Sequence, residues 1–206
     1  MVKNIIFDLM KVVIKKDSDI KTLMNFTNDI DKAEDLQKYI YITKEWKLLD
    51  LGNISHEQAI KEMQRKAPKE YSELIEEVMN NRCQYFTVNK ETVEIAKTLK
   101  EKGYHIYVLS NMSELAYTYF KDVDFFKICD GIIISAYEHL VKPDEKIFMT
   151  LLDRYDLKPE ECLFIDDDDT GKSLETANRL GILGRKVKPN DSQDVLTLLK
   201  EYKIEI

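Results

Sequence analysis

Acidic, hydroxyl and cationic side chains follow directly on apolar stretches at several places in this 206-residue chain. The first apolar stretch ends on Asp8, a second ends on Ser110 and Asn111, and Lys142 comes shortly after a third. A carboxylate can act as a nucleophile, a hydroxyl with backbone amides can hold phosphoryl oxygens, and a lysine can offset their charge. These segments together predict phosphoryl-transfer chemistry, provided that the fold brings them to one place.

A fourth apolar stretch ends on four consecutive aspartates, Asp166–Asp169. Adjacent carboxylates repel one another unless water screens them or a cation joins them. Oxygen ligands of this kind suit Mg²⁺, so we expect Mg²⁺ as a cofactor. Taken alone, each segment also has a structural interpretation: Ser110 and Asn111 as a strand-to-helix turn, Lys142 as a solvated side chain, and the aspartates as a loop that caps a helix. Their joint occurrence after apolar stretches favours the functional interpretation.

The apolar stretches have the composition of buried strands. From residue 89 to the end of the chain they alternate with segments of helical periodicity, and Pro143 stands where one such helix would have its first residue. This alternation predicts an α/β fold, a Rossmann-like parallel sheet with helices on both faces. In such sheets ligands bind beyond the carboxyl ends of the strands, which is where all four polar segments would meet.

A long segment near the N-terminus interrupts the alternation with helical periodicity alone. Within it, Ser55 and Gln58 have the spacing of a capping box, which predicts the start of a helix. We therefore predict a small all-helical cap of residues 15–81, inserted into an α/β core domain made of residues 1–14 and 82–206.

The cap should decide which substrate the protein accepts. Closing it over the strand ends would exclude water and supply the groups that contact the leaving part of a substrate. Trp46, His56 and Gln58 are candidates for these contacts, although a tryptophan is more often a packing residue.

Composition narrows the range of partners. A net charge of −7 does not supply the clustered cations that a nucleic-acid backbone requires, so we expect no nucleic-acid partner. No segment approaches the length needed to cross a bilayer and no signal peptide is visible, so we expect no membrane partner and a cytoplasmic location. The three cysteines are far apart and odd in number, which is typical of reduced thiols. The expected ligand is a small phosphorylated metabolite, bound by a monomer or a weak homodimer.

The order of the polar segments resembles that of the haloacid dehalogenase (HAD) superfamily. Its four motifs are similar to Phe7-Asp8 with Val12, Leu109-Ser110-Asn111, Lys142-Pro143-Asp144 and Phe164-Ile165-Asp166-Asp167. The inserted helical block matches the small-cap subgroup of this superfamily, so the resemblance covers essentially the whole chain. Within the cap, Leu51–Glu57 is similar to the turn and helix of the branch that contains glucose-1-phosphate phosphatase and related sugar-phosphate phosphatases.

The resemblance implies a Mg²⁺-dependent phosphatase that hydrolyses a small phosphate monoester, and the cap motif implies a sugar phosphate. Asp8 would attack the phosphorus atom and form an aspartyl-phosphate that water then hydrolyses. Ser110 and the backbone amide of Asn111 would hold the phosphoryl oxygens. Lys142 would offset the repulsion between the nucleophile and an anionic substrate and stabilise charge during transfer.

The resemblance also implies a position for the metal ion. Mg²⁺ would lie between Asp8, the backbone carbonyl of Met10 and an aspartate of the fourth motif. There it would neutralise the carboxylates and orient the phosphate. Alignment from the strand identifies Asp166–Asp167 as the ligand pair, whereas counting back from the following helix identifies Asp168–Asp169. We favour Asp166–Asp167, because a strand fixes the residues at its end and the loop beyond can absorb extra length.

The chain departs from the family pattern at Met10 and Lys11. Most phosphatases of the superfamily have a second aspartate two residues after the nucleophile as general acid, and Met10 stands at that position. These two long side chains could crowd the phosphate or bring Lys11 to it as an extra cation, so we count both as phosphate-contacting candidates. The departure leaves open a catalytically weakened or silent phosphate-binding protein.

Two further functions use a related set of groups. A 2-haloacid dehalogenase uses the same nucleophile, but it needs no metal and gains nothing from an acidic cluster beside Asp8. A receiver-type signalling domain has its acidic pair before the acceptor aspartate, which is the reverse of the order here. The acidic run after the fourth apolar stretch therefore favours the phosphatase.

Overall fold

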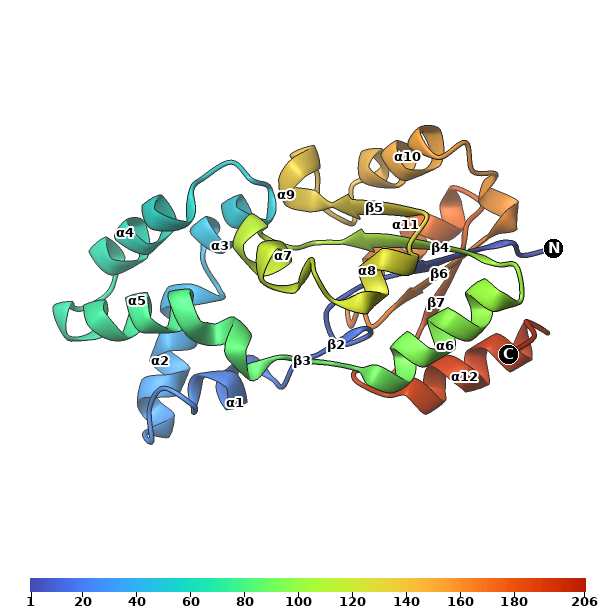
Figure 1. Ribbon diagram of the computed structural model, residues 1–206. Helices are drawn as coiled ribbons and strands as arrows, with labels where there is room; N and C mark the ends of the chain where they lie inside the picture. The colour runs from blue at the N-terminus through green and yellow to red at the C-terminus, as the bar shows by residue number, and fades with distance from the viewer.

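The computed structural model describes all residues, 1–206, and it has an α/β fold around one parallel sheet (Figure 1). The strand order is β5-β4-β1-β6-β7, and every neighbouring pair is parallel. The strands are β1 (Asn4–Phe7), β4 (His105–Ser110), β5 (Gly131–Ile134), β6 (Cys162–Asp166) and β7 (Leu183–Lys186). The predicted Rossmann-like parallel sheet is confirmed.

The register of the three central strands places the polar segments at one edge of the sheet. Phe7 of β1 lies opposite Val108 of β4 and Ile165 of β6. The next residues along each strand, Asp8 among them, therefore emerge at the same level. Asp8 donates its backbone N–H to the carbonyl of Ile165 at 2.9 Å, which ties the start of the loop to β6.

Helices cover both faces of the sheet because successive strand side chains point to opposite sides. Ile5 and Phe7 pack on one side against α6, α7, α8 and α12, and Ile6 packs on the other side against α10 and α11. In Figure 1, α10 lies above the sheet and α6 and α12 lie below it. The helices are α6 (Lys90–Glu101), α7 (Glu114–Phe120), α8 (Asp124–Ile128), α9 (Ser135–Glu138), α10 (Glu145–Arg154), α11 (Lys172–Arg179) and α12 (Ser192–Glu201), with a 3₁₀ turn, η3 (Pro159–Glu161).

The segment between β2 and β3 contains helices joined by turns, has no strand, and lies beside the sheet at the left of Figure 1. Twelve buried apolar residues, from Leu23 to Met79, form its own hydrophobic cluster. The chain enters and leaves this segment through a two-stranded antiparallel ribbon of β2 (Ile14–Lys15) and β3 (Thr87–Val88). The helices are α1 (Asp19–Leu23), α2 (Ile30–Ile40), α3 (Lys44–Asp50), α4 (His56–Lys66), α5 (Ser72–Asn81), η1 (Lys69–Tyr71) and η2 (Arg82–Tyr85). The limits of a cap at residues 15–81 stay a prediction.

Local sequence signals account for several helix ends, and one of them was misassigned. The capping box of Ser55 and Gln58 is present at the start of α4, as predicted. Pro143 does not open α10: the helix begins at Glu145, and the side chain of Asp144 caps it by accepting a hydrogen bond from the backbone N–H of Lys146. The prediction was wrong because an aspartate that can cap a helix stands directly after the proline.

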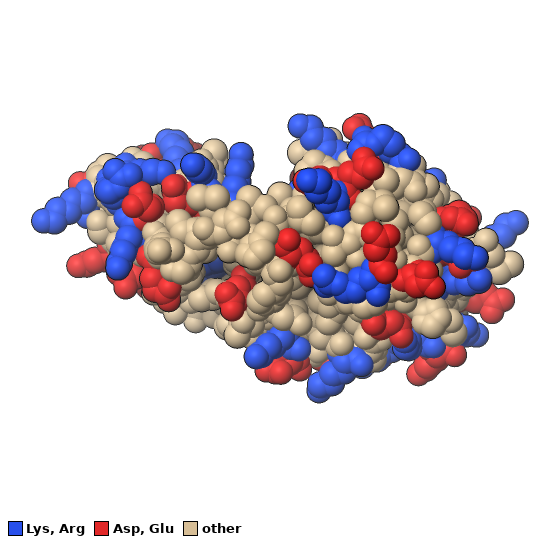
Figure 2. Space-filling view, turned by 90° about the horizontal axis from the view of Figure 1, so that it is seen from above, with Lys and Arg blue, Asp and Glu red and all other residues tan.

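The surface carries charges of both signs, and the helices are short or polar. Basic and acidic side chains are interspersed over both parts of the molecule on the face in view (Figure 2). No helix combines the length and the apolar character that crossing a membrane requires.

Candidate active site

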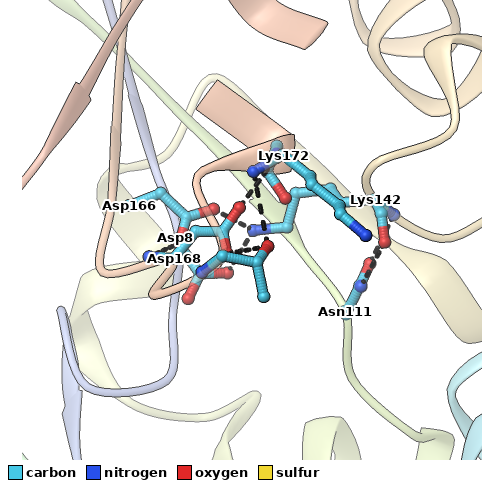
Figure 3. Close-up of polar contacts among 8 residues, drawn as sticks. Asp8, Asn111, Lys142, Asp166, Asp168 and Lys172 are labelled. Atoms are coloured by element: carbon cyan, nitrogen blue, oxygen red, sulfur yellow. Dashed lines mark hydrogen bonds and ion pairs between the residues drawn. The ribbon is translucent and has the colours of Figure 1, made fainter. Parts of the chain in front are cut away.

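A buried lysine lies between two aspartates at the carboxyl edge of the sheet. The Lys142 ammonium nitrogen is 2.8 Å from Oδ1 of Asp8 and 2.7 Å from Oδ2 of Asp166 (Figure 3). All three residues are buried. The loop after β1, the last residue of β6 and the loop after α9 supply these groups, so segments that are far apart in the sequence converge as predicted.

Lys142 is held in place by Asn111. The side-chain Nδ2 of Asn111 donates to the carbonyl oxygen of Lys142 at 2.9 Å, and its Oδ1 accepts from the backbone N–H of Lys142 at 2.7 Å. Figure 3 shows this pair on the opposite side of Lys142 from the carboxylates. The side chain of Asn111 therefore fixes the loop from which the lysine reaches the site.

Burial and like charges perturb the acid–base properties of this cluster. Burial raises the pKa of Asp8 to about 7, with Asp166 and Asp167 adding to the effect and Lys142 opposing it. Burial alone would lower the pKa of Lys142, but the carboxylates of Asp8 and Asp166 raise it above its ordinary value. The lysine therefore stays protonated, and a second cation at this edge would favour the ionised form of Asp8.

Asp167 completes a group of three carboxylates. One oxygen atom from each of Asp8, Asp166 and Asp167 lies within 4.8 Å of the others. Burial raises the pKa of Asp167, and the nearby Lys11 opposes this shift. Three converging carboxylate oxygens are the donor set that a hard cation such as Mg²⁺ prefers, so the residues present fit this ion.

The other two aspartates of the acidic run are turned away from this group. Asp168 accepts hydrogen bonds from the backbone N–H of Thr170 at 2.8 Å and of Ser173 at 2.7 Å, and so shapes the loop before α11. Burial alone would raise its pKa, but a hydrogen bond from the Thr170 hydroxyl at 2.7 Å, together with these two, lowers it to about 2. Asp169 is exposed and pairs with Lys186 at 2.9 Å. The geometry thus favours the pair at the strand end, Asp166–Asp167.

Ser110 and the start of the following loop present unused hydrogen-bonding groups. Ser110 is fully buried at the end of β4, and its Oγ has no hydrogen-bond partner in the protein. The backbone N–H of Asn111 also donates to no backbone acceptor. Because buried polar groups nearly always have partners, these two donors indicate a place for a ligand oxygen.

Met10 and Lys11 form a tight turn beside the carboxylates. Lys11 adopts a left-handed backbone conformation, with φ at 60°, and its N–H donates to the carbonyl of Ile14 at 2.7 Å. Its ammonium nitrogen lies 3.7 Å from Oδ2 of Asp167. Lys11 is therefore an additional cation at the edge of the site. A non-glycine residue with positive φ is uncommon, and such backbone conformations concentrate at functional sites.

A cavity of about 250 Å³ opens between this edge and the helical segment. Its sheet side includes Met10, Lys11, Asn111 and Asp167, and its helical side is lined by Lys16, Trp46, Asp50, Arg82 and Phe86. Trp46 was a candidate contact, and it does line this cavity. His56 and Gln58 instead line a separate cleft of about 950 Å³ between α4 and the helices α7 and α9.

Sequence reasoning missed three charged residues of this cavity: Lys16, Asp50 and Arg82. None of them belongs to a recognisable motif. The only local signal is that Asp50 stands at the C-terminal end of a helix, where a carboxylate is unfavourable next to the helix dipole.

A family model described as haloacid dehalogenase-like hydrolase matches residues 2–172, a span that contains every group of the site. The chain belongs to the HAD-like hydrolase family. Among curated proteins, acyl-CoA dehydrogenase family member 10 of Mus musculus is 41% identical over 58 residues, which are 28% of this HAD-like chain and 5% of that protein. The match thus covers a small part of that relative's length.

Solved structures of HAD enzymes share the fold of this HAD-like chain. A HAD-like family hydrolase of Porphyromonas gingivalis has 20% sequence identity, full coverage of both chains at 100% and a TM-score of 0.77. A HAD family enzyme of Bacteroides thetaiotaomicron, solved in complex with magnesium and inorganic phosphate, has 20% identity, covers 93% of this chain and 96% of that chain, and gives a TM-score of 0.73. At these identities the likeness is one of fold.

Proposed function

We propose that this HAD-like hydrolase is a Mg²⁺-dependent phosphatase that hydrolyses a small phosphate monoester through an aspartyl-phosphate on Asp8. The observation that carries the proposal is the position of Lys142 between Asp8 and Asp166, at the same edge of the sheet as the unpartnered hydroxyl of Ser110. An anionic substrate at this edge would meet a fixed cation, free donors and a carboxylate nucleophile together.

The metal ion would be held by the carboxylates of Asp8, Asp166 and Asp167, with the backbone carbonyl of Met10 as a further ligand. When bound, Mg²⁺ supplies positive charge that neutralises the carboxylates and orients the phosphate. The complex of the Bacteroides thetaiotaomicron enzyme with magnesium and inorganic phosphate supports this assignment.

Each protein group would have one role in the reaction. Asp8 presents Oδ2 to the phosphorus atom, since Oδ1 is bonded to Lys142 and Oδ2 has no protein partner. Ser110 and the N–H of Asn111 donate to the phosphoryl oxygens, and Lys142 neutralises the charge that builds up during transfer. Because Met10 cannot act as an acid, the leaving oxygen takes its proton from water.

The size of the cavity supports a small substrate. A volume of about 250 Å³ lies below the range of about 300–1,000 Å³ that is typical of sites for drug-sized ligands. A small sugar phosphate or a comparable phosphorylated alcohol fits this limit. We further propose that the protein acts in the cytoplasm as a monomer or a weak homodimer.

Hydrolysis assays test the proposal. The purified protein should release inorganic phosphate from p-nitrophenyl phosphate or from members of a panel of small phosphate monoesters when Mg²⁺ is present, and a chelator should stop the release. Lack of turnover over the whole panel would contradict the proposed function. Binding of beryllofluoride without turnover would instead identify a silent phosphate-binding protein.

A further inference from the structure

Two opposite charges line the helical side of the cavity without forming an ion pair with each other. Asp50 and Arg82 both belong to its wall, yet the Asp50 carboxylate accepts no hydrogen bond and has no cation within 4.0 Å. Burial raises the pKa of Asp50 to about 7, although Arg82 and Lys16 oppose the shift. A carboxylate in such a place costs free energy that no protein group offsets in full.

Arg82 has unused donors at the same place. The residue is buried, its Nη1 donates to the carbonyl of Met79, and its guanidinium lies 4.8 Å from the centre of the Trp46 ring. Its other N–H groups donate to no acceptor in the protein. Packing against the aromatic ring fixes the guanidinium plane, so these donors have a defined direction.

Asp50 is also fixed in position. Its carbonyl oxygen accepts a hydrogen bond of 2.5 Å from Oγ of Ser135 at the start of α9. Two residues on, Gly52 packs so closely on α9 that a Cβ atom there would lie 2.0 Å from the carbonyl oxygen of Ala136. The end of α3, and with it the main chain of Asp50, is therefore held against the sheet domain.

The charges select the kind of ligand that this side of the cavity can accept. A carboxylate or a second phosphate would be attracted by Arg82 and Lys16 but repelled by Asp50, and an ammonium group would meet the reverse, so neither charge suits both kinds of group. A neutral hydroxyl fits both groups, because it donates to a carboxylate and accepts from a guanidinium. Hydrogen bonds to charged groups are stronger than those between neutral groups.

We infer that Asp50, with Arg82, is a specificity-determining residue that binds a hydroxyl group on the leaving alcohol of the substrate. This inference rests on the proposed phosphatase function and deepens it: the substrate class is a small polyol phosphate, with the phosphate at Asp8 and a free hydroxyl at Asp50. The free carboxylate is thereby assigned a ligand, which explains why an unpaired charge is kept at the end of α3.

A matched pair of substrates tests the inference. Glycerol 1-phosphate and propyl phosphate have the same carbon skeleton and differ only in the two free hydroxyl groups. We expect the wild-type protein with Mg²⁺ to show a kcat/KM for glycerol phosphate at least about tenfold above that for propyl phosphate. Asp50→Asn should lower this ratio by about tenfold or more, since the charge-assisted hydrogen bond is lost.

Asp17→Asn is the control, because Asp17 is an exposed carboxylate of the linking segment before α1 and lies outside the cavity. It should leave the ratio unchanged. Thermal melts of both variants separate an effect on binding from a loss of structure, and Asp50→Ser provides a second replacement. A wild-type ratio near one overturns the inference whatever the variants do.

The remaining outcomes are distinct. If the wild-type protein hydrolyses both esters and Asp50→Asn or Asp50→Ser keeps the wild-type ratio, the inference fails and the phosphatase function stands. If phosphoethanolamine is preferred in an Asp50-dependent way, the group that Asp50 binds is an ammonium, and the hydroxyl assignment is wrong. If the wild-type protein hydrolyses no phosphate monoester, the proposed function fails and the inference falls with it.

Discussion

The side chain of Asn111 exchanges two hydrogen bonds with the main chain of Lys142, so that the residue after β4 fixes the loop that carries the site's buried cation. The lysine ammonium then has one defined position, in contact with both Asp8 and Asp166. The side chains of Asn111 and Lys142 thus connect the segments after β4, β1 and α9 with the end of β6. In the proposed reaction, Asn111 acts through its backbone on the phosphate and through its side chain on Lys142.

Removing this support should slow the reaction without abolishing it. In Asn111→Ala the Lys142 loop loses both hydrogen bonds, so we expect kcat to fall by about 10- to 100-fold, as small displacements of a charge-stabilising group cost this much. Steady-state kinetics with p-nitrophenyl phosphate measure the effect. Asn28→Ala, at an exposed asparagine before α2 that lines neither cavity, is the matched control. Equal kcat values for Asn111→Ala and the wild type would show that Lys142 needs no such support.

The choice between the two aspartate pairs has a direct metal test. Asp167 lies in the group of three carboxylates, whereas Asp169 is exposed and pairs with Lys186. We therefore expect Asp167→Asn to raise the Mg²⁺ concentration for half-maximal activity by about tenfold or more, and Asp169→Asn to leave it within about twofold. Activity titrations with Mg²⁺ and calorimetric titrations of the free proteins provide the two readouts. The reverse order would assign the metal to Asp168–Asp169.

Asp50 should make the wild-type protein less stable at high pH than an uncharged variant. The pKa of Asp50 is raised to about 7 by burial, against about 3.9 in an unfolded chain. Between these values the folded protein binds more protons, so the contribution of Asp50 to the free energy of unfolding is lost as the pH rises through about 4 to 7. Above pH 7 the folded state carries the cost of a half-buried carboxylate that has no ion pair.

Asp50→Asn removes this cost. We expect its free energy of unfolding to exceed that of the wild type by about 1–3 kcal/mol at pH 8, and the difference to vanish near pH 4. Urea unfolding at the two pH values measures it, with Asp17→Asn as the exposed control. A variant that is less stable than the wild type at pH 8 would show that Asp50 has a structural partner. If Asp50→Asn is more stable than the wild type and also loses the preference for the polyol phosphate, Asp50 serves binding and not stability.

The parts of the site that could be predicted from sequence are those that end strands. Asp8, Ser110 and Asp166 follow unbroken apolar runs, and a parallel sheet brings the ends of its strands to one edge whatever the connecting segments are. The sheet register, with Phe7 opposite Ile165, then favours Asp166–Asp167 over the next pair. The sequence pattern was enough to predict these positions, because residues that follow neighbouring parallel strands lie close together in space.

The parts that could not be predicted depend on packing between the helical segment and the sheet. Asp50 and Arg82 are 32 positions apart in the sequence and reach one cavity only because α3 docks on α9 and the segment after α5 returns beside it. No periodic pattern in the sequence predicts that Asp50 and Arg82 line the same cavity. His56 and Gln58 line the other cleft instead, so their contact with a substrate stays a prediction.

The most direct test of the account is whether Asp8 carries the phosphoryl group during turnover. The protein is mixed with Mg²⁺ and a hydrolysed phosphate monoester, quenched in acid and digested, and the peptide that contains Asp8 is examined by mass spectrometry before and after treatment with hydroxylamine, which cleaves acyl phosphates. The account predicts a hydroxylamine-sensitive phosphoryl group on Asp8, and a loss of turnover of at least about 10³-fold in Asp8→Asn. Turnover that leaves Asp8 unmodified and survives Asp8→Asn would contradict it.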